Sequence, residues 1–138
     1  MRVIGAIVLA LVCVSFFGTE QGPDECLSNL KIGTFYYYYG SDIVEIKRTE
    51  THQYEKFGGG KTENKLTWIS EDTYELRFVA KNSTPGCMGD GDKMTVKMSN
   101  CTPDYYTATI SSEMCGGGEA QIFKDKKKLQ KALKNYSE

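Results

Sequence analysis

The sequence predicts a mainly β protein: an antiparallel meander of seven or eight strands, closed or nearly closed into a small barrel, with a C-terminal amphipathic helix. Segments in which apolar and polar residues alternate recur between residues 33 and 123, as expected for strands with one buried face. Turn-forming residues separate these segments at short intervals, which favours antiparallel pairing. Closing such a sheet removes its exposed edges. The alternative is a flatter, open sheet capped by the helix.

The first predicted strand is the aromatic stretch "GTFYYYYG". Tyrosine is a good strand former, and neighbouring side chains of a strand point to opposite faces. We predict that Phe35, Tyr37 and Tyr39 face the barrel interior, whereas Tyr36 and Tyr38 face outward.

The alternation continues through the following segments: 43–50, 52–57, 65–70, 73–80, 93–98, 105–112 and 119–123. The clearest case is the fifth strand, where Tyr74, Leu76, Phe78 and Ala80 share one face and polar residues share the other. Three consecutive glycines close the third strand and are interpreted as a loose hairpin rather than a phosphate-binding loop.

The end of the chain is predicted to be helical. Its apolar residues recur at helical spacing and form one stripe on a Lys-rich segment: Leu129, Ala132, Leu133 and Tyr136. Asp125 is placed to cap this helix. We expect Leu129, Leu133 and Tyr136 to half cover the outward rings of Tyr36 and Tyr38, which would explain why both faces of the first strand carry aromatic residues.

The N-terminus predicts export. An uncharged run over residues 3–17 follows Arg2, and it is short for a membrane-spanning helix, so we interpret residues 1–18 as a signal peptide. The barrel domain then covers residues 19–124 and the helix 125–138. We expect a secreted or periplasmic protein with no stable membrane insertion after signal cleavage.

Four cysteines follow the predicted signal peptide: Cys26, Cys87, Cys101 and Cys115. An even number suits two disulfides in an oxidising compartment, and none of the four form the close pairs typical of zinc sites. Successive turns of a meander alternate between its two ends. This places Cys87 with Cys115 at one end. It places Cys26 with Cys101 at the other end if residues 43–48 and 52–57 are separate strands, and we predict these two disulfides.

Charge and composition argue against several functions. Residues 19–123 hold 10 Lys/Arg and 16 Asp/Glu, a net charge of −6, so we do not expect nucleic-acid binding. The single histidine, His52, leaves no histidine cluster for a metal or for acid–base chemistry. Asp90-Gly91-Asp92 is interpreted as a turn rather than a calcium loop. We predict no enzymatic activity, no metal and no cofactor.

Arg48 breaks the strand pattern, because it follows Val44 and Ile46 on the face predicted to be buried. We favour a structural ion pair with Glu50 or another carboxylate. The alternative is an arginine that binds an anionic ligand inside the barrel. The predicted ligand-binding set is Arg48, Phe35, Tyr37, Trp68, Phe78 and Met94.

The stretches "CLSNLKIGTFYYYYGSDIVEIKRTETHQYE" and "LTWISEDTYELRF" resemble a group of small exported proteins of the Bacteroidota type. The residues that carry the resemblance are Cys26, Lys31, Gly33, Phe35, Ile46, Arg48, Gln53, Glu55, Trp68, Tyr74, Leu76, Gly91 and Asp92. The resemblance implies a lipocalin-like small β-barrel and no established activity. The Gly-rich segment 116–118 and the Lys-rich tail depart from the usual ending of the group.

Two functions follow as expectations. The first is a secreted, non-enzymatic β-barrel that binds a small hydrophobic or anionic ligand, which requires space inside the barrel. The alternative is a protein-interaction or structural module with a filled core, in which Tyr36, Tyr38 and neighbouring rings form an exposed patch.

Overall fold

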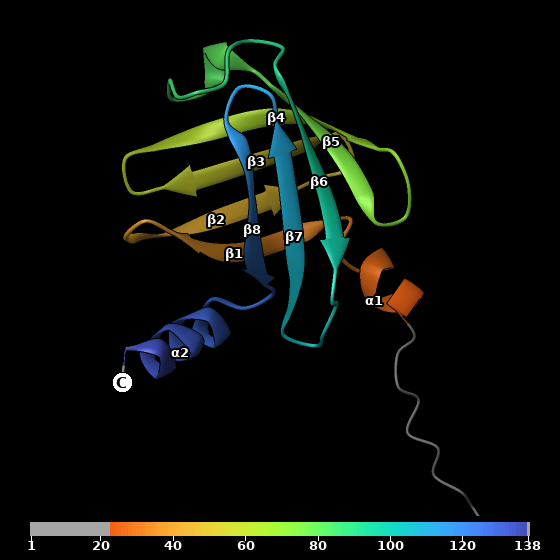
Figure 1. The fold of residues 1–138 in the computed structure, drawn as a ribbon, viewed down its shortest axis with the longest axis vertical. Coiled ribbons are helices and arrows are strands. Elements are labelled where there is room, and N and C mark those ends of the chain that lie inside the picture. Colours follow the sequence, from red (N-terminus) through yellow and green to blue (C-terminus); the bar gives the residue numbers. More distant parts are fainter. Residues whose placement is uncertain (1–22, 138) are drawn as a thin grey trace, which may run out of the picture.

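The computed structural model describes residues 23–137, which form one closed barrel with one helix before it and one after it (Figure 1). The helices are α1 (Pro23–Ser28) and α2 (Lys126–Tyr136). The strands are β1 (Gly33–Tyr39), β2 (Asp42–Arg48), β3 (His52–Phe57), β4 (Gly60–Trp68), β5 (Thr73–Phe78), β6 (Lys93–Ser99), β7 (Tyr105–Ser112) and β8 (Gly116–Phe123). A short 3-10 helix (Ala80–Asn82) lies between β5 and β6. The predicted signal peptide, residues 1–18, lies outside the described residues.

Every strand pairs antiparallel with the next one, and β1 closes the barrel against β8 at Tyr36 and Phe123. This confirms the predicted meander and its closure. In Figure 1, β1–β4 run across the view while β6–β8 run nearly vertically. Short turns join β1 to β2, β3 to β4 and β7 to β8, whereas a longer loop with the 3-10 helix joins β5 to β6. Gly40, between β1 and β2, adopts a φ of 63°, which glycine tolerates without strain.

The barrel has two ends that differ in how they are filled. At the end where β1 begins and β8 finishes, called here the α1 end, Leu30 from the segment that follows α1 is fully buried. The opposite end, where β1 finishes and β8 begins, is called the far end. The core cluster consists of Leu30, Phe35, Ile46, Leu66, Tyr74, Leu76, Val96, Met98, Tyr106, Ala108 and Ile122.

Both predicted disulfides are confirmed. Cys26 is bonded to Cys101 with a Cα–Cα distance of 6.1 Å, and Cys87 to Cys115 with 5.4 Å, both ordinary spacings for a disulfide. The first bond holds α1 to the loop between β6 and β7. The second holds the β5–β6 loop to the β7–β8 hairpin at the far end.

Three expectations about single elements were wrong. Helix α1 was not predicted, because six residues carry too little periodicity to reveal a helix. Strands β4 and β8 begin at Gly60 and Gly116, earlier than the predicted residues 65 and 119, because their glycines join the antiparallel ladders. Tyr39, expected inside the barrel, is 76 % exposed because β1 ends there, at the rim.

Helix α2 lies against β1 and β8. The Asp125 carboxylate accepts hydrogen bonds from the backbone N–H groups of Lys127 and Lys128, which confirms the predicted cap. Leu129 is buried, but Tyr136 is 83 % exposed and therefore does not contribute to the expected cover. Tyr38 remains 46 % exposed, so the helix covers this side of β1 less completely than the stripe predicted.

Candidate functional site

A hydrogen-bonded polar network occupies the barrel interior and starts at Arg48, the last residue of β2. The Arg48 side chain is 1 % exposed. Its guanidinium donates to the carbonyl oxygen of Leu30 at 2.6 Å and to the side-chain oxygen of Gln53 at 3.0 Å. It also donates to the hydroxyl oxygens of Tyr74 and Tyr106, at 2.9 and 3.0 Å. Neutral acceptors from four separate segments thus hold one buried cation.

Aromatic rings complete the surroundings of Arg48. The guanidinium carbon lies 4.9 Å from the ring centre of Phe35 and 4.7 Å from that of Tyr74, within the range of cation–π attraction. Burial lowers the pKa of Arg48, but Tyr74 and Tyr106 outweigh this effect and raise it, so the side chain stays charged. Burial, followed by Tyr106, raises the pKa of Tyr74 well above its ordinary value.

The expected ion pair between Arg48 and Glu50 does not form. Strand β2 ends at Arg48, so the alternation of faces stops there and Glu50 lies exposed in the following turn. Within residues 23–137, Arg48 makes no salt bridge to any carboxylate. The favoured ion pair is therefore wrong, because the hydrogen-bond partners of Arg48 are neutral groups of the protein.

The network continues toward the far end through Gln53 and Glu55. The Gln53 amide donates to one carboxylate oxygen of Glu55 at 2.8 Å, and the Tyr37 hydroxyl donates to the other at 2.9 Å. Burial and, next, the negative charge of Glu55 raise the pKa of Tyr37 far above its ordinary value, so Tyr37 remains a neutral donor. The described part of the chain contains no buried side-chain nitrogen or oxygen without a hydrogen-bond partner.

The two ends of this network differ in their access to solvent. Arg48 and Gln53 are buried, whereas Tyr37 and Glu55 are partly exposed. The strand register nevertheless places Tyr37 and Glu55 on the inner face, opposite Val44 and Ile46. The carboxylate end of the network is therefore accessible to solvent, whereas the guanidinium end is not.

Strand β8 carries a bare stretch of the inner wall. Gly118 pairs with Ile110, and Ala120 pairs with the buried Ala108, so the register places Gly118 on the inner face. Gly118 is exposed, and a methyl group built at its Cα would meet no other atom within 4 Å. Its φ lies outside the left-handed region, so a larger residue fits the backbone here. The inner wall thus faces open space at this position.

Of the predicted ligand-binding residues, Arg48 and Phe35 are in contact, whereas the others are spread along the barrel. Phe35 and Phe78 are buried, whereas Tyr37, Trp68 and Met94 are partly buried against the core. Trp68 lies at the α1 end, 4.9 Å from the ring of Tyr74 and 5.2 Å from the Lys31 ammonium, whereas Met94 and Phe78 lie toward the far end.

Sequence reasoning missed Gln53, Glu55 and Gly118 as site residues. The alternation of Gln53 and Glu55 around an exposed Tyr54 is the signal that places both on one face of β3. Gly118 gave no such signal, because a glycine run is typical of a loop.

His52 lies on the outer face of β3, where its ring stacks on Tyr54 with 5.8 Å between ring centres. Its Nδ1 lies 2.8 Å from the Thr51 hydroxyl, and its Nε2 lies 3.8 Å from Glu63. The histidine and the inner carboxylate Glu55 therefore point to opposite sides of the strand and do not form an acid–base pair.

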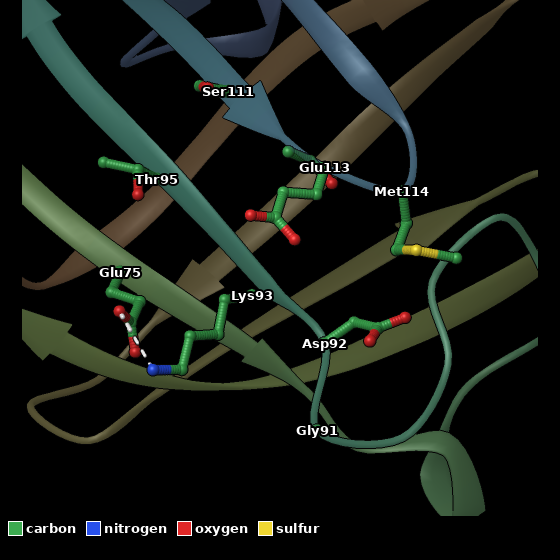
Figure 2. Close-up of a pocket in the computed structure, with 9 residues that line it drawn as sticks. Glu75, Gly91, Asp92, Lys93, Thr95, Ser111, Glu113 and Met114 are labelled. Carbon is green, nitrogen blue, oxygen red and sulfur yellow. Dashed lines mark ion pairs between the residues drawn. The ribbon is translucent and has the colours of Figure 1, made fainter.

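A pocket lies on the outer surface, across β5, β6 and β7 near the far end (Figure 2). It has a volume of about 490 Å³ and a mostly polar lining that includes Glu75, Asp92, Lys93 and Glu113. Lys93 lies 3.9 Å from Glu75, and the Asp92 carboxylate accepts a hydrogen bond from the Gly89 backbone. No cluster of metal-binding side chains occurs among the described residues. We take the inner network as the candidate site because Gln53 links a buried cation, Arg48, to a partly exposed carboxylate, Glu55.

Comparisons of the chain with protein-family models, with curated proteins and with solved structures found no match. The resemblance to small exported proteins of the Bacteroidota type therefore stays a prediction. In the part of the chain that the structure describes, neither helix is long and apolar enough to span a bilayer.

Proposed function

We propose that this protein is an exported, non-enzymatic β-barrel that binds a small, largely apolar ligand on its inner wall near the far end. The observation that carries the proposal is the bare wall at Gly118, where a closed barrel leaves open space beside an exposed glycine. Small barrels of eight strands have room for one small ligand when side chains do not fill the interior.

The surroundings of Gly118 support an apolar ligand. Ile110, Ala120 and Met94 are inner-face residues that remain partly exposed while packing against the core. Covering apolar surface contributes about 25 cal/mol per Å², so a ligand that shields these side chains from water gains binding energy.

Export and the lack of enzymatic activity are parts of the same proposal. Two disulfides suit an oxidising compartment, and the N-terminal sequence has the pattern of a signal peptide. On the inner face, the partly exposed ionisable groups of the network are one carboxylate and one tyrosine with a strongly raised pKa. This set provides no activated nucleophile.

The test fills the space and leaves the barrel otherwise intact. Gly118→Leu is expected to abolish binding of an apolar fluorescent probe such as N-phenyl-1-naphthylamine while keeping the β-sheet circular dichroism spectrum. Gln121→Leu is the matched control, because it adds a leucine to the same strand at an exposed position of the outer face. Native mass spectrometry of protein purified from its source then searches for a bound small molecule.

Two results would contradict the proposal. Probe binding that survives Gly118→Leu unchanged would place the probe elsewhere on the molecule. A wild-type protein that binds no apolar probe and retains no small molecule would favour the interaction module, whose exposed rings Tyr38, Tyr39 and Tyr54 are available to a partner.

A further inference from the structure

We propose that the ligand carries a protonated amine or a comparable hydrogen-bond-donating head group, and that the Glu55 carboxylate receives it. This inference rests on the proposed function and adds the chemical class of the ligand. The inference is based on which end of the interior network is accessible. The Glu55 carboxylate is partly exposed to solvent, whereas the Arg48 guanidinium is buried.

The positive end of the network is closed to a ligand. Arg48 uses its guanidinium donors on four partners within the protein, and Leu30, one of them, is itself fully buried. An anionic head group would have to open the buried surroundings of Arg48 to reach its fifth N–H, or displace the hydrogen bonds that Arg48 donates to the tyrosines and to Leu30. Arg48 therefore serves the barrel rather than an anionic ligand.

The negative end retains capacity for a donor. An ionised carboxylate has two oxygens and about four acceptor positions. Gln53 and Tyr37 each donate one hydrogen bond to Glu55, one to each oxygen. Both existing partners are neutral, and Glu55 is partly exposed on the inner face. A ligand could therefore donate a third hydrogen bond to the Glu55 carboxylate without displacing Gln53 or Tyr37.

The charge of the ligand's head group determines its affinity when ligands of equal chain length are compared. A ligand carboxylate near Glu55 meets a like charge in a partly desolvated setting, whereas an ammonium group gains a charge-assisted hydrogen bond. Such bonds contribute roughly twice as much as bonds between neutral groups. We therefore expect affinity to decrease from an alkyl amine to an alkyl alcohol to an alkyl carboxylate of equal chain length.

The experiment compares dodecylamine, dodecanol and dodecanoate by displacement of N-phenyl-1-naphthylamine at pH 7, with each probe below its solubility limit and below any micelle formation. Wild-type protein is expected to bind the amine about tenfold more tightly than the alcohol, the size of one charge-assisted hydrogen bond. Glu55→Gln should reduce this preference to about onefold, because it removes the charge that favours the amine. Glu45→Gln, which removes an exposed outer-face charge from β2, is the matched control and should leave the preference intact.

Tyr37→Phe provides a second variant if Glu55→Gln fails to fold. It removes one donor from Glu55 and leaves the carboxylate, so the preference for the amine should be equal to the wild-type value or greater. Dodecanoate that binds as tightly as the amine, or an amine preference that persists in Glu55→Gln, would overturn the inference and leave the proposed function standing. Failure of all three probes to bind would instead contradict the proposed function itself.

Discussion

Replacing Arg48 with methionine tests whether the buried cation holds the barrel together. Methionine keeps an unbranched apolar stem that can still pack between Phe35 and Tyr74. It removes every donor, so the Leu30 carbonyl and the Gln53 side-chain oxygen lose their Arg48 hydrogen bonds. We expect the variant to fold into the same barrel with a substantially lower free energy of unfolding.

The magnitude follows from the hydrogen bonds. Arg48 has four acceptors, and leaving a buried acceptor unpaired costs about 1 kcal/mol or more each. Two effects reduce the total: the buried cation no longer has to be desolvated, and the hydroxyls of Tyr74 and Tyr106 can bond to each other. A net loss of about 3 kcal/mol is therefore expected for Arg48→Met.

Urea unfolding measures this loss as a shift of the midpoint at constant m-value. Arg77→Met is the matched control, because Arg77 lies on the exposed outer face, and its loss should be below about 0.5 kcal/mol. Tyr74→Phe should cost about 1–2 kcal/mol in the wild type and clearly less in the Arg48→Met background, since coupled contacts are not additive. A loss below about 0.5 kcal/mol for Arg48→Met, or equal costs of Tyr74→Phe in both backgrounds, would refute the reasoning.

Three further predictions concern titration, a disulfide and a helix cap. The pKa values of Tyr37 and Tyr74 are raised in the fold, so the unfolded chain loses these protons first as pH rises. The free energy of unfolding should therefore decrease above about pH 10, by about 1.4 kcal/mol per pH unit for each tyrosine. Tyr74→Phe should remove one of these two contributions in urea titrations, and an unchanged slope would contradict the prediction. Replacing Cys26 and Cys101 with alanine opens a closed loop spanning 75 residues and should cost about 4 kcal/mol by chemical denaturation, whereas a cost near zero would show that the bond does not constrain the unfolded chain. Asp125→Ala should cost about 1 kcal/mol, and Asp125→Asn, which keeps an acceptor, should cost clearly less; equal costs would argue against the cap.

Much of the fold could be predicted because its information is local. The alternation from Thr73 to Phe78 is visible within a few residues, and the same pattern recurs along the barrel. The disulfide pairing followed from the same source, because the number of strands between two cysteines decides whether they lie at the same end. Strand parity also placed Arg48 correctly on the inner face.

The candidate site depended on information that parity alone does not contain. The partners of Arg48 come from β3, β5, β7 and the segment after α1, so they are known only when the register of every strand is known. Glu50 looked like the natural partner because the strand was expected to continue past Arg48. Gly118 lay outside the predicted strand 119–123, whereas its pairing with Ile110 makes it part of the barrel wall.

The closure of the barrel has a consequence for the order of folding. Among the described residues, a single register pair, Tyr36 with Phe123, joins β1 to β8, whereas the β7–β8 ladder runs along both strands. Each hairpin joins neighbours in the chain, but the seam joins strands from opposite ends of the domain and carries the largest loop-closure entropy. Helix α2 follows β8 and contacts both strands of the seam. We therefore expect the pairs of neighbouring strands to form first and the β1–β8 pairing to form last, where contacts of α2 with both strands stabilise it.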